Sequence, residues 1–92
     1  MALGIYFPVK GMSPDRYAAV HRDLAAAGLE HPAGRTFHAG SRVGDEIHVF
    51  DVWESEETFR AFGEHLMPIL VANGVEPGEP RVGEIELIVS PD

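Results

Sequence analysis

Three side chains near the middle of the chain have the types needed for acid–base chemistry on a flat ligand: His38, Asp51 and Trp53. The sequence around them predicts two strands, 35–42 and 46–53, joined as a hairpin. A carboxylate opposite an imidazole orients the ring as a general base, and a neighbouring indole offers an apolar wall to an aromatic ligand. We therefore predict His38 and Asp51 as catalytic residues and Trp53 as a substrate-binding residue.

The predicted hairpin register follows from placing Gly44 and Asp45 at the centre of the turn. Counting outward, His38 faces Asp51, Thr36 faces Trp53, Phe37 pairs with Val52 and Ala39 pairs with Phe50. One face is then apolar and is predicted to lie against the helices; its residues are Phe37, Ala39, Phe50 and Val52. The other face is predicted to point away from them; it carries Thr36, His38, Val49, Asp51 and Trp53. The competing interpretation is an ordinary cross-strand charged pair beside a core tryptophan.

Further candidates are weaker. Tyr6 and His65 are predicted as additional substrate-binding residues, although Tyr6, like Tyr17, also fits a packed aromatic role. His21, sited on a helix flank, and His48 are interpreted as structural or peripheral. No histidine spacing of a metal site occurs, so no metal and no cofactor are predicted.

Composition excludes several classes of partner. The chain has 92 residues, enough for one small domain, predicted as 1–92. Its net charge of −8 comes from 15 acidic and 7 basic residues, which argues against nucleic acid and anionic membranes as partners. The chain has no cysteine, and its first residues lack the pattern of a secretory signal, so a cytoplasmic location is expected.

The remaining elements set the fold. Residues 2–9 and 81–89 predict two more strands. Ser13 followed by proline starts a first helix, and Ser55 followed by two glutamates starts a second. The order β-α-β-β-α-β predicts an α+β, ferredoxin-like domain, with a four-stranded antiparallel sheet and two helices on one face.

The face of the sheet without helices is predicted to carry too many apolar residues for free exposure. The pattern assigns Trp53, Val49 and Ile47 to it, with Ile85, Leu87 and Val89 or their neighbours from the last strand. A second copy packed sheet against sheet would cover them. We therefore predict a homodimer that forms an α+β barrel.

With these elements the chain resembles the dimeric α+β barrel superfamily, in particular its antibiotic-biosynthesis-monooxygenase-like branch. The resemblance is sharpest at Asp51-Val-Trp-Glu-Ser-Glu-Glu-Thr-Phe59 and extends to Phe7-Pro-Val-Lys-Gly-Met-Ser-Pro-Asp15. It implies paired subunits, ligands bound within the barrel or between a sheet and its own helices, and either cofactor-free oxidation of aromatic polyketides or haem degradation. Trp53 matches a pocket tryptophan of that family.

Other positions depart from the family pattern. Ile5 stands where haem-degrading relatives carry asparagine, and Phe62 or Gly63 stands where they carry histidine. Val49 replaces the asparagine of the quinone-forming enzymes. These departures argue against haem degradation, and they also remove polar side chains that the oxygenases of the family use. His38, Asp51 and His65 would form a substitute set.

Two functional hypotheses follow. The first is a dimer with a small-molecule pocket that acts as a cofactor-independent monooxygenase or an isomerase on an aromatic or quinone-type compound. The alternative is a non-catalytic ligand-binding or stress-response dimer. A third interpretation is a structural dimer without a pocket. The first requires His38, Asp51 and Trp53 to share one face beside a cavity.

Overall fold

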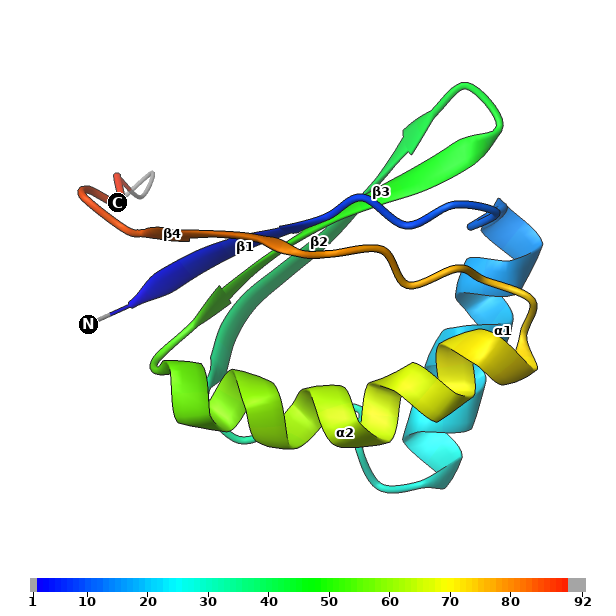
Figure 1. The fold of residues 1–92 in the computed structure, drawn as a ribbon, viewed down its shortest axis with the longest axis horizontal. Helices are drawn as coiled ribbons and strands as arrows, with labels where there is room; N and C mark the ends of the chain where they lie inside the picture. The colour runs from blue at the N-terminus through cyan, green and yellow to red at the C-terminus, as the bar shows by residue number, and fades with distance from the viewer. Residues whose placement is uncertain (1, 90–92) are drawn as a thin grey trace.

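The computed structural model describes residues 2–89 as a β-α-β-β-α-β unit. Its elements are β1 (Leu3–Phe7), α1 (Pro14–Ala26), β2 (Arg35–Val43), β3 (Glu46–Trp53), α2 (Glu56–Ala72) and β4 (Arg81–Glu84). The strands form one antiparallel sheet in the order β2-β3-β1-β4, and both helices lie along the same side of it (Figure 1). The predicted α+β, ferredoxin-like architecture is confirmed.

Both helices begin at the predicted serine caps. The Ser13 hydroxyl accepts a hydrogen bond from the backbone N–H of Arg16, and the Ser55 hydroxyl accepts one from that of Thr58. Each bond satisfies a donor that the first helical turn would otherwise leave without a partner. Helix α2 continues past Pro68 to its end. Neither helix in the described part of the chain is long and apolar enough to cross a bilayer.

The predicted hairpin register is confirmed from the turn as far as Phe37, which pairs with Val52. Beyond that pair, the prediction that Thr36 faces Trp53 is wrong. A register shift places Arg35 opposite Trp53 instead. Such a β-bulge inserts one extra residue into a strand and changes which face the following side chains occupy.

The faces of the hairpin are the reverse of those predicted. Phe37 and Phe50, expected against the helices, are 53% and 40% exposed. Four of the five buried residues of β3 lie on the other register, namely Ile47, Val49, Asp51 and Trp53; the fifth, Val52, lies on the register of Phe50. Strand β1 determines this choice, because its apolar side pairs with the buried set; the pairs are Leu3 with Trp53, Ile5 with Asp51 and Phe7 with Val49. The apolar stripes of the helices therefore cover the face that carries Asp51.

The last strand is shorter than predicted. It ends at Glu84 rather than at residue 89, although Ile85 still donates a backbone hydrogen bond to Ala2. Residues 85–89 have no regular structure, and their apolar side chains are 78%, 64% and 82% exposed at Leu87, Ile88 and Val89. The chain thus leaves apolar surface uncovered at this end of the sheet.

Candidate functional site

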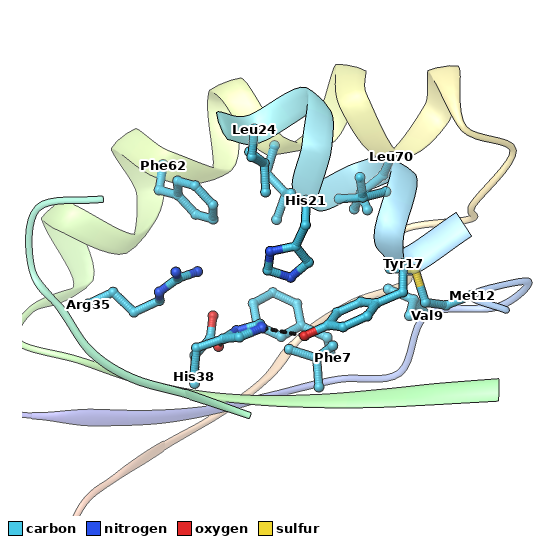
Figure 2. Close-up of a pocket in the computed structure, with 14 residues that line it drawn as sticks. Phe7, Val9, Met12, Tyr17, His21, Leu24, Arg35, His38, Phe62 and Leu70 are labelled. Carbon is cyan, nitrogen blue, oxygen red and sulfur yellow. Dashed lines mark hydrogen bonds and ion pairs between the residues drawn. The ribbon is translucent and has the colours of Figure 1, made fainter. Parts of the chain in front are cut away.

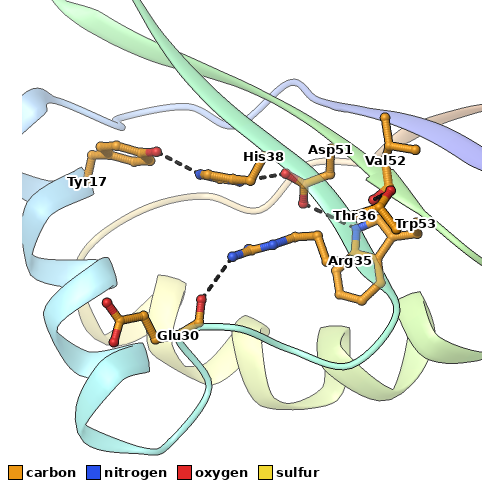
Figure 3. Close-up of polar contacts among 8 residues, drawn as sticks. All are labelled: Tyr17, Glu30, Arg35, Thr36, His38, Asp51, Val52 and Trp53. Carbon is orange, nitrogen blue, oxygen red and sulfur yellow. Dashed lines mark hydrogen bonds and ion pairs between the residues drawn. The ribbon is translucent and has the colours of Figure 1, made fainter. Parts of the chain in front are cut away.

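A chain of three hydrogen bonds crosses the helix-covered face of the sheet (Figure 3). The Tyr17 hydroxyl lies 2.7 Å from Nε2 of His38, and Nδ1 of His38 lies 2.5 Å from Oδ1 of Asp51. Trp53 donates its indole N–H to the other Asp51 oxygen across 3.3 Å. Because an ionised carboxylate only accepts hydrogen bonds, His38 donates from Nδ1, and Nε2 accepts from the Tyr17 hydroxyl. The chain fixes both the orientation and the tautomer of the imidazole.

Two elements bring these groups together. The confirmed hairpin register places His38 directly across from Asp51. Helix α1 supplies Tyr17 and, one turn later, His21 on the same side. Gly40 gives the Tyr17 ring its space, since a Cβ at this position would lie 2.5 Å from the Tyr17 hydroxyl oxygen.

These groups line a cavity between the sheet and its two helices (Figure 2). The space that a water-sized sphere can occupy is about 40 Å³, within about 450 Å³ of atom-free space that includes open solvent. Its polar lining consists of Tyr17, His21, Arg35, His38 and Asp51, and the other nine lining residues are apolar. Within residues 2–89, no three His, Asp or Glu side chains are grouped so that they could hold a metal ion.

The two helix-borne polar groups titrate away from neutral pH. Burial lowers the pKa of His21 below its ordinary value of 6.5, and the neighbouring His38 and the Arg35 guanidinium lower it further. Burial raises the pKa of Tyr17 above 10.0, and the charge of Asp51 adds to this effect. His21 is therefore uncharged near neutral pH and Tyr17 keeps its proton. The His21 ring lies 4.5 Å from that of Tyr17 and 5.2 Å from that of His38, both edge-on.

The structure brings His38 and Asp51 together and places Trp53 behind Asp51. The Trp53 side chain is fully buried and does not line the cavity. The indole packs against Phe59 and Phe62, with ring centroids 5.7 and 5.3 Å away. In this position the indole holds Asp51 through its N–H.

Tyr6 and His65, also predicted to bind substrate, lie outside this cavity. Tyr6 occupies the opposite face of the sheet, where its hydroxyl is 3.4 Å from Nδ1 of His48. His65 is exposed on α2 beside a separate shallow depression, which it lines with Leu29 and Phe62 among others. Neither side chain contributes to the lining of the cavity beside His38.

Three polar lining residues were missed as site candidates. The sequence does contain a signal for Tyr17 and His21. They are four residues apart, and Leu24 follows three residues after His21, so all three lie on the inward face of α1. Arg35 had no comparable signal, because strict alternation along β2 separates it from His38. Only the bulge places it on the same face.

The chain has the fold of the antibiotic-biosynthesis-monooxygenase-like structures, with a cavity between its sheet and helices. A protein assigned to these monooxygenases from Chloroflexus aurantiacus superposes with a TM-score of 0.67 at 13% identity, over 98% of each chain. The predicted resemblance is thereby confirmed as a resemblance of fold.

Two characterised structures share this fold. SnoaB, a cofactor-independent oxygenase from Streptomyces nogalater, gives a TM-score of 0.63 at 20% identity, over 99% of this chain and 96% of SnoaB. The monooxygenase ActVA-Orf6 of Streptomyces coelicolor, solved with the ligand nanaomycin D, gives 0.54 at 16% identity, over 99% and 91%. No family model and no curated protein matches the sequence.

Proposed function

We propose that this protein oxygenates an aromatic or quinone-type compound without a cofactor, with His38 as the general base. The observation that carries the proposal is the Tyr17–His38–Asp51 hydrogen-bond chain, which opens into the cavity between sheet and helices. The fold shared with a cofactor-independent oxygenase and with a monooxygenase that binds nanaomycin D supports it. An isomerisation would begin with the same proton removal.

The chemistry assigned to each residue follows from the hydrogen bonds. Asp51 holds Nδ1 of His38, so Nε2 is the nitrogen that accepts a proton. In an aromatic substrate with an activated methylene, such as anthrone, loss of that proton leaves a carbanion that passes electrons to O₂. The methylene carbon becomes a carbonyl, one oxygen atom enters the product, and the other leaves as water. The substrate thus supplies all the electrons that reduce the oxygen.

Oxygen uptake with anthrone tests the proposal. The protein should accelerate the conversion of anthrone to anthraquinone, and His38→Ala should lower kcat by about 10²–10⁴-fold, the usual contribution of a general base. His48→Ala is the matched control, because this histidine lies on the other face of the sheet. Equal loss in both variants, or an unchanged rate in His38→Ala, would count against His38 as the base.

A non-catalytic ligand-binding protein is the second candidate, and one contact favours it. The Tyr17 hydroxyl occupies Nε2 of His38 at 2.7 Å, so a substrate reaches the base only by turning Tyr17 aside or through its hydroxyl. Naphthoquinone binding that requires the cavity, together with no oxidation of anthrone by the parent protein, would favour this candidate.

We also propose that two copies pair through the faces of the sheet that lack helices. The support is the exposure of Phe37 and Phe50 on that face, since large apolar side chains in one patch mark an interface. Light scattering should give twice the chain mass of 10.0 kDa. Phe50→Glu should give the monomer, whereas Val71→Glu, at an exposed position on α2, should not. A monomeric parent protein would contradict the pairing.

A further inference from the structure

Arg35 reaches the cavity only because β2 is irregular. In a regular strand, Arg35 and His38 would lie on opposite faces, since they are three residues apart. The bulge pairs Arg35 with Trp53 and so places it on the face of Asp51 and His38. Bulges often re-aim a side chain next to a functional site. This bulge adds a permanent positive charge to a cavity that otherwise contains one carboxylate.

The guanidinium group of Arg35 keeps donors available for a ligand. One NH₂ group donates to the backbone carbonyl of Glu30 across 3.0 Å, and the group lies 5.8 Å from the centre of the Phe62 ring. Within the described part of the chain, no carboxylate lies within ion-pair distance of it. A guanidinium has five N–H donors, so most remain for another acceptor. Figure 2 shows the group directed into the space between Phe62 and His38.

The only carboxylate in the cavity lining is already engaged. Both oxygens of Asp51 accept hydrogen bonds, from His38 and from Trp53. Asp51 therefore does not neutralise Arg35 through a direct contact. The charge of Arg35 acts on the site from a distance, since it opposes the larger effect of burial on the Tyr17 pKa. A negatively charged oxygen of a bound ligand could accept hydrogen bonds from Arg35 and neutralise its charge.

We propose that Arg35 binds an ionised oxygen of the ligand, so that the cavity selects flat aromatic compounds carrying a phenolate, enolate or hydroxyquinone anion over neutral compounds of the same shape. This inference rests on the proposed ligand cavity and not on turnover. It assigns the class of ligand: a planar anion, with its charged oxygen at the Arg35 end and its ring against the apolar lining. A guanidinium suits this task because its charge persists at every physiological pH.

Paired ligands test the proposal. Lawsone is a hydroxynaphthoquinone that is ionised at neutral pH, and its methyl ether has the same rings without the charge. Calorimetry on the full chain should show lawsone binding at least about tenfold more tightly, a difference of about 1.4 kcal/mol. Arg35→Gln removes the charge but keeps a polar side chain, and it should weaken the binding of lawsone far more than that of the ether and so abolish the preference. Arg35→Lys should retain part of it.

Arg81→Met is the control for loss of a positive charge, since Arg81 is exposed on β4; it should leave the preference intact. Equal weakening of both ligands in Arg35→Gln would mean that Arg35 only supports Phe62 and the Glu30 loop, and would overturn the proposal. So would a preference that survives the substitution, or a parent protein that binds neither ligand. Failure of anthrone oxidation alongside a retained lawsone preference would remove the oxygenase function but not the anion site.

Discussion

On each face of the sheet a histidine lies beside a tyrosine, and the two pairs differ in almost every other respect. On the helix-covered face, Tyr17 and His38 lie 2.7 Å apart, and Asp51 holds the second ring nitrogen at 2.5 Å. On the open face, Tyr6 and His48 lie 3.4 Å apart with rings at 66°. No ion pair in residues 2–89 involves His48. The same two residue types make a defined polar chain only where a buried carboxylate completes it.

The difference arises from what each face packs against. Asp51 is 2% exposed, so its charge must be matched by hydrogen bonds, and these bonds fix the geometry. The open face has solvent as an alternative partner for each polar group, so nothing enforces one arrangement there. Burying the Asp51 carboxylate therefore costs stability. The hydrogen bonds that its burial requires also hold the His38 ring in one orientation, as acid–base chemistry needs.

The sharpest contrast between the faces is the cost of removing the buried carboxylate. Asp51→Ala leaves the Trp53 N–H and the His38 Nδ1–H without their acceptor, and should lower the free energy of unfolding by about 3–5 kcal/mol. Urea denaturation measures it. Glu64→Ala, at an exposed position on α2, should change the same quantity by less than about 0.5 kcal/mol. Equal small losses would mean that the polar chain does not stabilise the fold.

Much of this fold could be predicted from the sequence, but the orientation of the hairpin could not be predicted from the hairpin alone. Ser13 and Ser55 fixed the helix starts, and the Gly44 turn fixed the pairing of His38 with Asp51. Both faces of the hairpin carry large apolar residues, so its own alternation does not identify the core side. The clearer alternation of β1 does, because neighbours across strands share a face.

The composition of the cavity was less predictable than the fold. Counting outward from the turn correctly paired His38 with Asp51, because a short turn determines which residues of the two strands face each other. The position of Arg35 in the cavity could not be predicted. One extra residue in β2 moves Arg35 to the other face of the strand, and no residue type in the sequence indicates this bulge. Trp53 does share a face with Asp51, as predicted, but the helices cover that face, and the depth of the indole depends on how Phe59 and Phe62 pack against it.

Filling the space beside Tyr17 should disturb only the helix-covered face. A methyl group at Gly40 would meet the Tyr17 ring at 2.7 Å, whereas one at Gly83 meets nothing within 4 Å. Gly40→Ala should therefore cost about 1–3 kcal/mol of unfolding free energy through overpacking. Gly83→Ala, also on a strand, should be neutral or slightly stabilising. A neutral Gly40→Ala would show that Tyr17 is not held where the hydrogen bond requires.

Removing each tyrosine hydroxyl compares the two pairs directly. Tyr17→Phe loses the 2.7 Å bond to His38 and should cost about 1 kcal/mol in urea unfolding, the usual net contribution of a hydrogen bond. Tyr6→Phe loses a 3.4 Å contact at a half-buried site and should cost less than about 0.5 kcal/mol. The reverse order would place the stronger pair on the open face.

The smallest expected effect concerns pH. Because the pKa of His21 is lowered by burial, the unfolded chain binds its proton more readily than the folded protein does. The stability that this group contributes is present above 6.5 and is lost as pH falls through the folded-state pKa. Between about pH 8 and about pH 5, His21→Gln should lose less stability than the parent protein. His31→Gln, in an exposed loop, should behave like the parent; identical slopes in all three would contradict the assignment.

The central claim is that a flat aromatic ligand binds between the sheet and its helices, beside His38. Amide and side-chain NMR shifts on titration with naphthoquinone test it most directly. If the ligand binds there, the shifts should concentrate at Tyr17, His21 and His38. Shifts concentrated at Tyr6, His48 and Phe50, with the cavity residues unchanged, would contradict it.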